Sequence, residues 1–311
     1  MMKLSFVIPV FRNEGSIFPT YEKIKNLLIK LNLDYEFIFV NDGSDDNSIF
    51  ELVNIHNEDN KVKVLSFSRN FGQVPAIIAG MKEVTGDAAI SLSADLQEPI
   101  ELIESMITKW KAGNEIVICH RVDREDSFIA NNTSAVFYKL IKISNPKMPK
   151  GGFDFLLIDK KALIYFNEID ERNRFFQGDI LWLGFNTAFI PYNRLKRTIG
   201  KSQWTLSKKM KYFIDGLLNT SYVPIRLMSL IGIIISLLGF IYSFVIAYNR
   251  FFNNTPFDGW APIMILILII GGLIMLMLGI IGEYVWRTYD ETRKRPIYII
   301  KDRLVKNEEN N

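Results

Sequence analysis

The chain has 311 residues, with 37 basic and 34 acidic side chains and a formal net charge of +3. This length allows one large domain or two modest ones, and the near balance of charges excludes the broad basic surface of a typical nucleic-acid-binding protein. The single cysteine, Cys119, excludes an intramolecular disulfide and a catalytic dithiol. The two histidines, His56 and His120, are too few and too scattered for a zinc site.

Apolar, β-branched or aromatic runs alternate with helix-like segments between residues 4 and 119. Regular alternation of this kind predicts an α/β fold with a parallel sheet, in which ligands bind at the carboxyl ends of the strands. The expected strands are 4–10, 37–40, 62–67, 88–92 and 116–119, and the expected helices are 16–31, 48–56, 74–84 and 100–112.

Polar side chains follow the first four of these strands. The first strand leads to Asn13 and Glu14, the second to an Asn-Asp-Gly-Ser turn at 41–44, and the third to the polar segment 68–72. The fourth leads to the loop that holds Asp95. One such ending would be ordinary turn chemistry, whereas four endings with different polar side chains predict one shared site.

The loop after the fourth strand, residues 93–99, reads Ser-Ala-Asp-Leu-Gln-Glu-Pro. Residues at i and i+2 of an extended segment point the same way. Asp95 and Gln97 can therefore converge on one hard cation, which takes oxygen ligands of this kind. The alternative for Asp95 is that it caps the helix that follows.

Two apolar segments in the last third of the chain, 225–248 and 262–282, each have about the ~20 residues that cross a hydrocarbon core. One alone would also suit a buried helix of a soluble protein, but two in succession predict a transmembrane hairpin. The loop between them, 249–261, has one basic residue, Arg250, whereas both flanks are strongly basic. The positive-inside rule therefore places both termini in the cytoplasm.

These segments predict the organisation of the whole chain. A cytoplasmic domain would take residues 1–204, and residues 283–311 would form a cytoplasmic tail. Residues 205–224 combine lysines with apolar side chains, as in a juxtamembrane amphipathic helix attracted to anionic lipid. The segment 134–143 is also amphipathic, and it suits either the membrane interface or packing on the soluble core.

Taken together, these blocks resemble family 2 glycosyltransferases. They are most similar to the polyisoprenyl-phosphate glycosyltransferases, such as dolichyl-phosphate mannose synthase and the bacterial GtrB-like and ArnC-like enzymes. Any single block is weak, but the set is specific in this order and with the paired apolar segments. The resemblance covers most of the chain, through residues 7–14, 40–46, 68–72, 86–87, 95–99, 200–202, 282–284 and 295–296.

The resemblance implies a GT-A (Rossmann-like) fold, a nucleotide-sugar donor, Mg²⁺ or Mn²⁺, and a lipid-phosphate acceptor. It implies that Asp95 and Gln97 hold the metal against the donor diphosphate, and that Arg121 and Ser134 lie towards the acceptor phosphate. For Arg121, the alternative is an exposed charge at a strand end. The donor-binding residues that the resemblance implies are Pro9, Phe11, Glu14, Asp42, Arg69 and Asp95.

Further basic and acidic residues could take part in the reaction. Arg194, Arg197 and Lys201 could add positive charge to the active site, or they could form a solvated face attracted to lipid. A lipid phosphate is already anionic and needs no general base, so positioning and electrostatics can carry most of the catalysis. Asp154 and Asp179 are candidate acceptor-side carboxylates, with Asp179 preferred, unless each is a structural cap or turn residue.

The sequence also departs from the family pattern. Ser93 stands where the first carboxylate of an Asp-x-Asp motif is usual, so the metal would have fewer anionic ligands. Phe11 stands where Tyr is common, Glu98 and Ile100 replace the more frequent Asp and Pro, and only Arg124 could supply a second arginine after Arg121. These differences affect affinity and substrate identity more than the class of reaction.

The expected function is inverting transfer of a sugar, with a UDP-hexose favoured as donor, to a polyprenyl phosphate such as undecaprenyl phosphate. The product would serve cell-envelope glycan or lipid modification at a bacterial-type inner membrane. Membrane lipid is an expected partner, nucleic acid is not, and the resemblance allows a homo-oligomer. The alternatives are a family 2 enzyme with a saccharide acceptor and a catalytically silent membrane scaffold, which only Ser93 favours.

Overall fold

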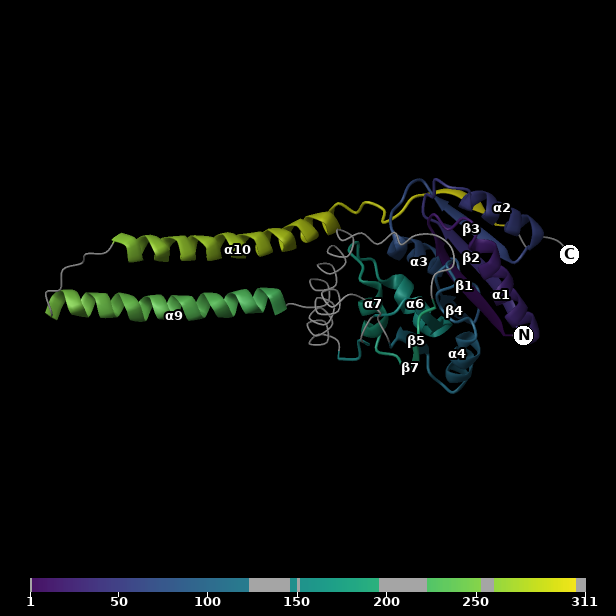
Figure 1. Cartoon of the computed structure of the whole chain (residues 1–311), viewed down its shortest axis with the longest axis horizontal. Helices are drawn as coiled ribbons and strands as arrows, with labels where there is room; N and C mark the ends of the chain where they lie inside the picture. Colours follow the sequence, from purple (N-terminus) through teal and green to yellow (C-terminus); the bar gives the residue numbers. More distant parts are fainter. Residues whose placement is uncertain (1, 123–145, 150–151, 196–222, 253–259, 306–311) are drawn as a thin grey trace. The chain divides into compact units, whose positions relative to one another are not determined.

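The computed structural model describes residues 2–122, 146–149, 152–195, 223–252 and 260–305. The chain divides into two compact units, one made of Met1–Thr220 with Arg295–Asn311 and the other of Ser221–Lys294. The first unit is built on one eight-stranded sheet with the order β7-β5-β6-β4-β1-β2-β3-β8 (Figure 1).

The centre of the sheet consists of four parallel strands, as the sequence predicts. β1 pairs in parallel with both β2 and β4, and β2 pairs in parallel with β3. Their side chains are almost all buried, because helices cover both faces of the sheet, and this explains the continuous apolar runs. The strands are β1 (Lys3–Val10), β2 (Asp34–Asn41), β3 (Val62–Phe67) and β4 (Ala88–Ser91).

Helices connect these strands and form a layer on each face of the sheet. The apolar side chains of α1, α2 and α4 join one hydrophobic core, and those of α3, α6 and α7 join the core on the other face (Figure 1). In α1 the buried residues Ile17, Tyr21, Ile24 and Leu28 recur at helical spacing, so one stripe of the helix faces the sheet. The helices are α1 (Ile17–Lys30), α2 (Ser48–Glu58), α3 (Gln73–Lys82), α4 (Leu102–Lys111), α6 (Lys160–Glu168) and α7 (Phe176–Trp182).

The outer part of the sheet differs from the expected parallel arrangement. The fifth predicted strand, β5 (Ile116–Arg121), does not pair with β4, because β6 (Phe155–Asp159) lies between them and is antiparallel to both. β7 (Thr187–Tyr192) then pairs in parallel with β5. The expectation of a wholly parallel sheet is therefore wrong for this half, since a short apolar run such as β6 carries no periodicity that reveals its direction.

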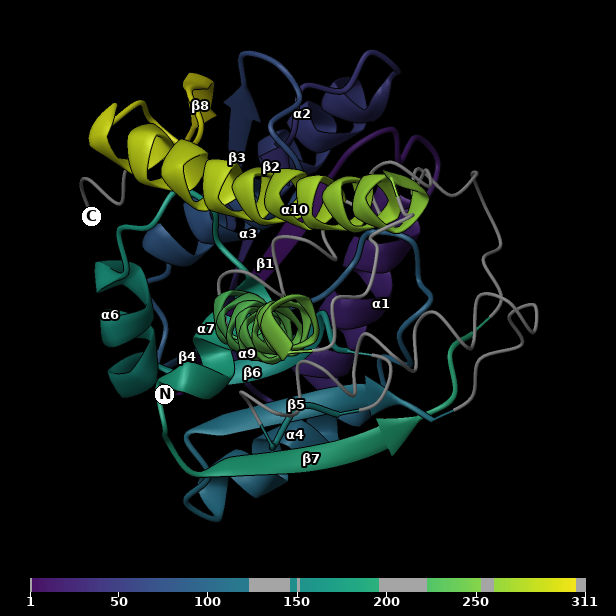
Figure 2. The same ribbon diagram turned by 90° about the vertical axis from the view of Figure 1, so that its left-hand side faces the viewer.

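A further strand comes from the segment after the apolar helices. β8 (Ile300–Leu304) pairs antiparallel with β3 and forms the edge of the sheet (Figure 2). From the sequence, this segment was expected to belong to a cytoplasmic tail, residues 283–311. In the structure, residues from 295 onward belong to the same compact unit as the sheet.

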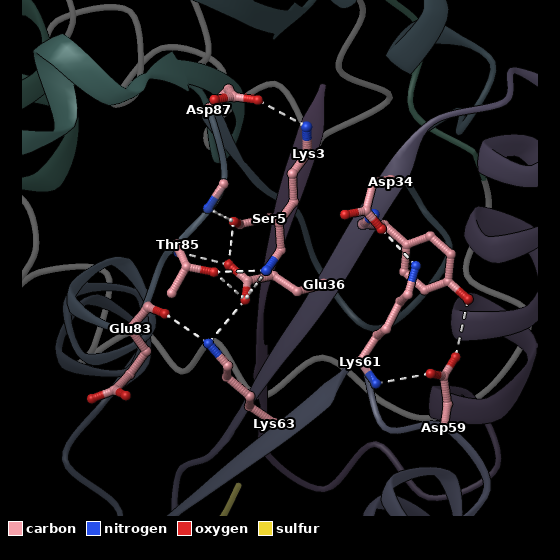
Figure 3. Close-up of polar contacts among 12 residues, drawn as sticks. Lys3, Ser5, Asp34, Glu36, Asp59, Lys61, Lys63, Glu83, Thr85 and Asp87 are labelled. Atoms are coloured by element: carbon pink, nitrogen blue, oxygen red, sulfur yellow. Dashed lines mark hydrogen bonds and ion pairs between the residues drawn. The ribbon is translucent and has the colours of Figure 1, made fainter. Parts of the chain in front are cut away.

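Two buried carboxylates stabilise the amino ends of the central strands (Figure 3). Glu36 accepts hydrogen bonds from the backbone N–H of Thr85 at 2.7 Å and from its hydroxyl at 2.8 Å, and Lys63 Nζ lies 2.9 Å away. Burial alone would raise the pKa of Glu36, but hydrogen bonds from Ser5, Lys63 and Thr85 outweigh it and lower the pKa to about 2.

Asp59 plays the same part for α1 and β2. It accepts hydrogen bonds from the hydroxyls of Tyr21 at 2.7 Å and Tyr35 at 3.1 Å, and it forms an ion pair of 2.9 Å with Lys25. Burial would raise the pKa of Asp59, but Lys25 and the backbone N–H of Lys61 lower it to about 2. Both networks lie at the edge of the sheet opposite the carboxyl ends of β1, β2 and β3.

The second unit consists of two long apolar helices, α9 (Val223–Phe252) and α10 (Trp260–Thr292), which lie side by side in opposite directions (Figure 1). They contain the two segments expected to form a hairpin. By length and composition, one helical stretch among the described residues could cross a membrane, Ile269–Thr292 with 24 residues. A shorter apolar stretch, Met228–Tyr242, lies in α9. Membrane crossing by both helices stays a prediction.

Candidate active site

The loops that follow β1, β2, β3 and β4 meet at the carboxyl edge of the sheet, as the polar strand endings predict. Asp42 is the centre of this arrangement and is only 3% exposed. Its carboxylate accepts hydrogen bonds from Asn70 Nδ2 at 2.9 Å and from the backbone N–H groups of Phe71 at 2.6 Å and Gly72 at 2.9 Å. Asp42 therefore fixes the loop 68–72, which we call the donor loop, against the end of β2.

Gly43 allows the donor loop to approach this closely. It has a φ of +65°, and a Cβ placed on it would lie 2.4 Å from the carbonyl carbon of Arg69. No other residue type fits both requirements, since a side chain would be strained at this φ and would collide with the loop backbone. The Asp-Gly pair at 42–43 thus does more than form a turn: Asp42 binds the backbone of the donor loop, and Gly43 leaves room for it.

The loops after β1 and β2 are tied together by their predicted polar residues. Glu14 accepts hydrogen bonds from Asn47, at 2.8 Å from the side-chain amide and 3.3 Å from the backbone N–H. Arg12 donates two hydrogen bonds of 2.6 Å to Asp45. The backbone N–H of Phe11 donates to Asn13 at 2.9 Å. The contacts of Glu14 and Arg12 hold the loop after β1 beside the loop after β2.

Other predicted donor-binding residues lie at the same edge. Pro9 is near the end of β1, in register with Val40. Arg69 is exposed, with its guanidinium carbon 4.2 Å from the centre of the Phe71 ring. Pro9 and Arg69 thus lie at the same edge of the sheet as Asp42.

The expected metal-binding pair lies in the loop after β4. Asp95 is 5% exposed and Gln97 is 9% exposed. The backbone N–H of Gln97 donates to Asp95 Oδ1 at 3.2 Å. Two further bonds join Gln97 to Leu195: the side-chain Nε2 of Gln97 donates to the Leu195 carbonyl at 3.3 Å, and the backbone carbonyl of Gln97 accepts from the Leu195 N–H at 3.0 Å. These bonds fix the Gln97 side chain and leave its amide oxygen as an acceptor, which is the atom that a hard cation requires.

The site offers few side chains that could act as metal ligands. No group of three or more His, Cys, Asp or Glu residues in the part of the chain that the structure describes could hold a metal ion. A cation here would therefore take most of its ligands from a bound diphosphate and from water, as Mg²⁺ commonly does. The residues present fit such a cation, because both supply oxygen atoms and a further buried carboxylate oxygen nearby has no partner.

That oxygen belongs to Glu98, which sequence analysis noted only as a departure from the family pattern. Glu98 is 2% exposed, and the Ser93 hydroxyl donates a hydrogen bond to its Oε1 at 3.1 Å. Its Oε2 is buried with no hydrogen-bond partner among the described residues. Burial and the negative charge of Asp95 raise the pKa of Glu98 to about 7, against the opposing effect of Arg121 and Arg194.

Two predicted acceptor-side residues lie beside Glu98. Arg121, at the end of β5, forms an ion pair of 3.5 Å with Asp154, and its buried Nε has no hydrogen-bond partner in the described part of the chain. Burial would lower the pKa of Arg121, but Asp154 and Tyr192 raise it above its ordinary value. The pKa of Arg194 is lowered, mainly because the side chain is partly buried and also because Arg121 repels its positive charge. The structure thus brings Asp95, Arg121, Asp154 and Arg194 together around Glu98.

Asp179 has a different environment. It lies in the first turn of α7 and forms a close ion pair with Arg174. Arg174 in turn donates to the Ile169 carbonyl at 2.7 Å, and its guanidinium carbon lies 4.7 Å from the centre of the Phe166 ring. Burial raises the pKa of Asp179 to about 6 in spite of Arg174. This environment favours a structural role for Asp179, and a role as base stays untested.

Three predicted acceptor-side residues, Ser134, Arg197 and Lys201, lie outside the described residues. Glu98 and Tyr192 lie in the site but were not among the residues expected from the sequence. The only signal for Glu98 was the joint change of Ser for Asp at position 93 and Glu for Asp at position 98.

Comparison with known proteins identifies the family of the chain. The family described as glycosyl transferase family 2 matches residues 5–164 of the chain. The chain is 38% identical over 303 residues to the glycosyltransferase YkcC of Bacillus subtilis (strain 168), covering 96% of this chain and 94% of the relative. It is 36% identical over 302 residues to the prophage bactoprenol glucosyl transferase homolog of Escherichia coli (strain K12), covering 96% of this chain and 99% of the relative.

The fold is also similar to that of a solved enzyme. Glucosyl-3-phosphoglycerate synthase from Mycobacterium tuberculosis, in complex with Mn²⁺, UDP-glucose and phosphoglyceric acid, superposes with a TM-score of 0.53 at 16% identity. The match covers 70% of this chain and 79% of that chain. The prediction of a GT-A fold is confirmed.

Proposed function

The chain belongs to glycosyl transferase family 2, and we propose that it transfers a hexose from a UDP-hexose to a polyprenyl phosphate such as undecaprenyl phosphate. The observation that carries this proposal is the group of Asp95, Glu98, Arg121 and Arg194 at the carboxyl edge of the sheet. Relatives named bactoprenol glucosyl transferase, at 35–36% identity over nearly the whole chain, support the lipid acceptor and make UDP-glucose the first donor to test.

The donor would lie against the loops after β1, β2 and β3. The exposed Arg69 offers positive charge to a nucleotide, and the hydrogen bonds from Phe71 and Gly72 to Asp42 hold the donor loop that carries it. A divalent cation held by Asp95 and Gln97 would neutralise the charge that develops on the leaving diphosphate. The Mn²⁺ and UDP-glucose bound in the solved enzyme of similar fold support this choice of cation and donor.

The acceptor phosphate would lie beside Arg121 and Arg194. The unpartnered Nε of Arg121 is buried, and a phosphate oxygen would satisfy it with a charge-assisted hydrogen bond. In the reaction, an anionic phosphate oxygen of the acceptor forms a bond to the anomeric carbon as the bond from that carbon to UDP breaks. A single displacement of this kind inverts the anomeric carbon and needs no general base.

We place this reaction at the cytoplasmic face of a bacterial-type inner membrane. α9 and α10 would both span it, with both termini of the chain in the cytoplasm, and 205–224 would lie along the lipid surface. The apolar length of α10 and the basic flanks of the two helices support this topology. A polyprenyl phosphate keeps its tail in the bilayer and would present its head group to the sheet domain.

The test uses the purified full chain in detergent with Mn²⁺, undecaprenyl phosphate and a set of radiolabelled nucleotide sugars. We expect label to move from one UDP-hexose into the organic phase, and only when the lipid is present. Transfer to an added saccharide without lipid would contradict the proposed acceptor. Failure of every donor, with metal and lipid verified, would contradict the proposed activity.

A further inference from the structure

The segment after α10 contacts the base of the donor loop. The backbone N–H of Ser68, the first residue of the loop, donates to the carbonyl of Ile299 at 3.0 Å. One residue earlier in each segment, the ring of Tyr298 stacks on that of Phe67, with ring centres 5.0 Å apart and planes 10° from parallel. The pairing of β8 with β3 is irregular between Ser66 and Phe67, at this same point.

The contact continues from Phe67 into the loop. The Phe67 ring meets the edge of the Phe71 ring at a distance of 5.6 Å between centres and an interplanar angle of 88°. Phe71 carries two other interactions of the site, since its N–H donates to Asp42 and its ring lies under the guanidinium of Arg69. The rings of Tyr298, Phe67 and Phe71 thus form a continuous row, and Arg69 packs on the last of them.

We propose that Tyr298 is a positioning residue for the donor, which acts through Phe67 and Phe71 to keep the donor loop in its binding conformation. The proposal rests on the proposed function, because it takes the loop to be where the nucleotide binds. Phe67 is 3% exposed and is the last residue of β3, so it is held in the sheet when the loop moves. Without the ring at 298, one face of Phe67 would lose its cover, and Phe71 would lose the support that orients it.

The expected effect is on donor binding and not on the chemical step. Tyr298 precedes β8, and the strands β3, β2 and β1 lie between β8 and β4, after which the Asp95 loop begins. An aromatic pair is worth ~0.5–1.5 kcal/mol, which corresponds to about a two- to tenfold change in a binding constant. Tyr298→Ala should therefore raise the Kd for UDP and the donor KM by that factor, with kcat at saturating donor nearly unchanged.

The experiment compares Tyr298→Ala, Tyr298→Phe and Arg303→Ala with the unaltered full chain in detergent. Tyr298→Phe keeps the stacked ring. Arg303→Ala is the matched control on β8, which follows Tyr298, because it breaks the 2.9 Å ion pair with Glu83 but leaves the three aromatic rings intact. UDP with Mn²⁺ is titrated into each protein, and hydrogen–deuterium exchange is followed at the Phe71 and Gly72 amides, which donate to Asp42.

We expect faster exchange at both amides and weaker UDP binding for Tyr298→Ala, with the other two variants close to the unaltered chain. Tyr298→Leu keeps apolar volume but not the ring, so its exchange rate and UDP affinity should lie between those of Tyr298→Ala and the unaltered chain. If Tyr298→Ala does not fold, Tyr298→Leu takes its place in the comparison. Equal exchange at both amides in all variants, or an equal effect of Arg303→Ala, would overturn the proposal. Absence of UDP binding to the unaltered chain would instead contradict the proposed function, since the exchange measurement does not need a ligand.

Discussion

The Ser93 hydroxyl donates a hydrogen bond to the buried carboxylate of Glu98 at 3.1 Å. This pair explains how two departures from the family pattern fit together. A carboxylate at the half-buried position 93 would place a second negative charge next to the buried carboxylate of Glu98. A serine there satisfies one oxygen of Glu98 and adds no charge.

Ser93→Asp should therefore destabilise the protein, even though it restores the more usual motif. The cost of an additional buried and poorly satisfied polar group is about 1–3 kcal/mol, which a thermal melt of the purified protein in detergent would detect. The double variant Ser93→Asp, Glu98→Gln should recover most of the loss, because the new carboxylate would then face a neutral amide. Equal melting temperatures for Ser93→Asp and the unaltered chain would contradict this explanation.

Asp95→Ala should abolish sugar transfer without preventing folding or membrane insertion. It removes the carboxylate that we expect to hold the cation, and the loss should exceed a hundredfold, as for other groups that stabilise developing charge, where ~10²–10³ is typical. Asp34→Ala is the matched control, because Asp34 pairs with Lys61 at the opposite edge of the sheet. Transfer of label to undecaprenyl phosphate is the measurement, and near-normal metal-dependent activity of the Asp95 variant would contradict the site assignment.

Gly43→Ala should damage both stability and donor binding. Gly113→Ala is the comparison, since Gly113 also has a positive φ, of +96°, but a Cβ there would meet nothing within 4 Å. The left-handed backbone costs a non-glycine residue ~1–2 kcal/mol, and we expect that loss of unfolding free energy in both variants. Gly43→Ala should lose about 1–3 kcal/mol more from the collision with Arg69, and it alone should raise the Kd for UDP.

The stability of the sheet domain should fall in acid because of Glu36. The pKa of Glu36 is lowered from its ordinary value of 4.5 to about 2. Its contribution is therefore fully present above pH 4.5 and is lost as the pH falls through about 2. The shift corresponds to about 3 kcal/mol. Glu36→Gln should lose a comparable amount at pH 7, because Lys3 and Lys63 keep their charges and lose their partner.

Urea unfolding at several pH values between 3 and 7 would measure this dependence. The unaltered chain should lose stability over the lower part of this range, and Glu36→Gln should show a smaller slope. Identical slopes for the two proteins would show that other carboxylates, such as Asp59, account for the acid sensitivity.

The centre of the fold and the position of the site could be predicted from the sequence for a physical reason. β1 to β4 are continuous apolar runs that end in polar loops, and parallel strands bring those loops to one edge. β6 and β8 could not be predicted, because short apolar runs do not reveal their partners. Glu98 became visible only in the structure, since Tyr192 at the end of β7 and Arg194 just after it are brought to the loop after β4 from a distant part of the sequence.

The position of β8 has a consequence for the order in which the chain folds during synthesis. β3 ends at residue 67 and β8 begins at residue 300, with both apolar helices made in between. At ~5–20 residues per second, a ribosome leaves the outer edge of β3 without its partner for roughly 10–50 s. An open strand edge can pair with other chains. The nascent protein is therefore exposed to misassembly at β3 until α9 and α10 have been synthesised and β8 pairs with β3.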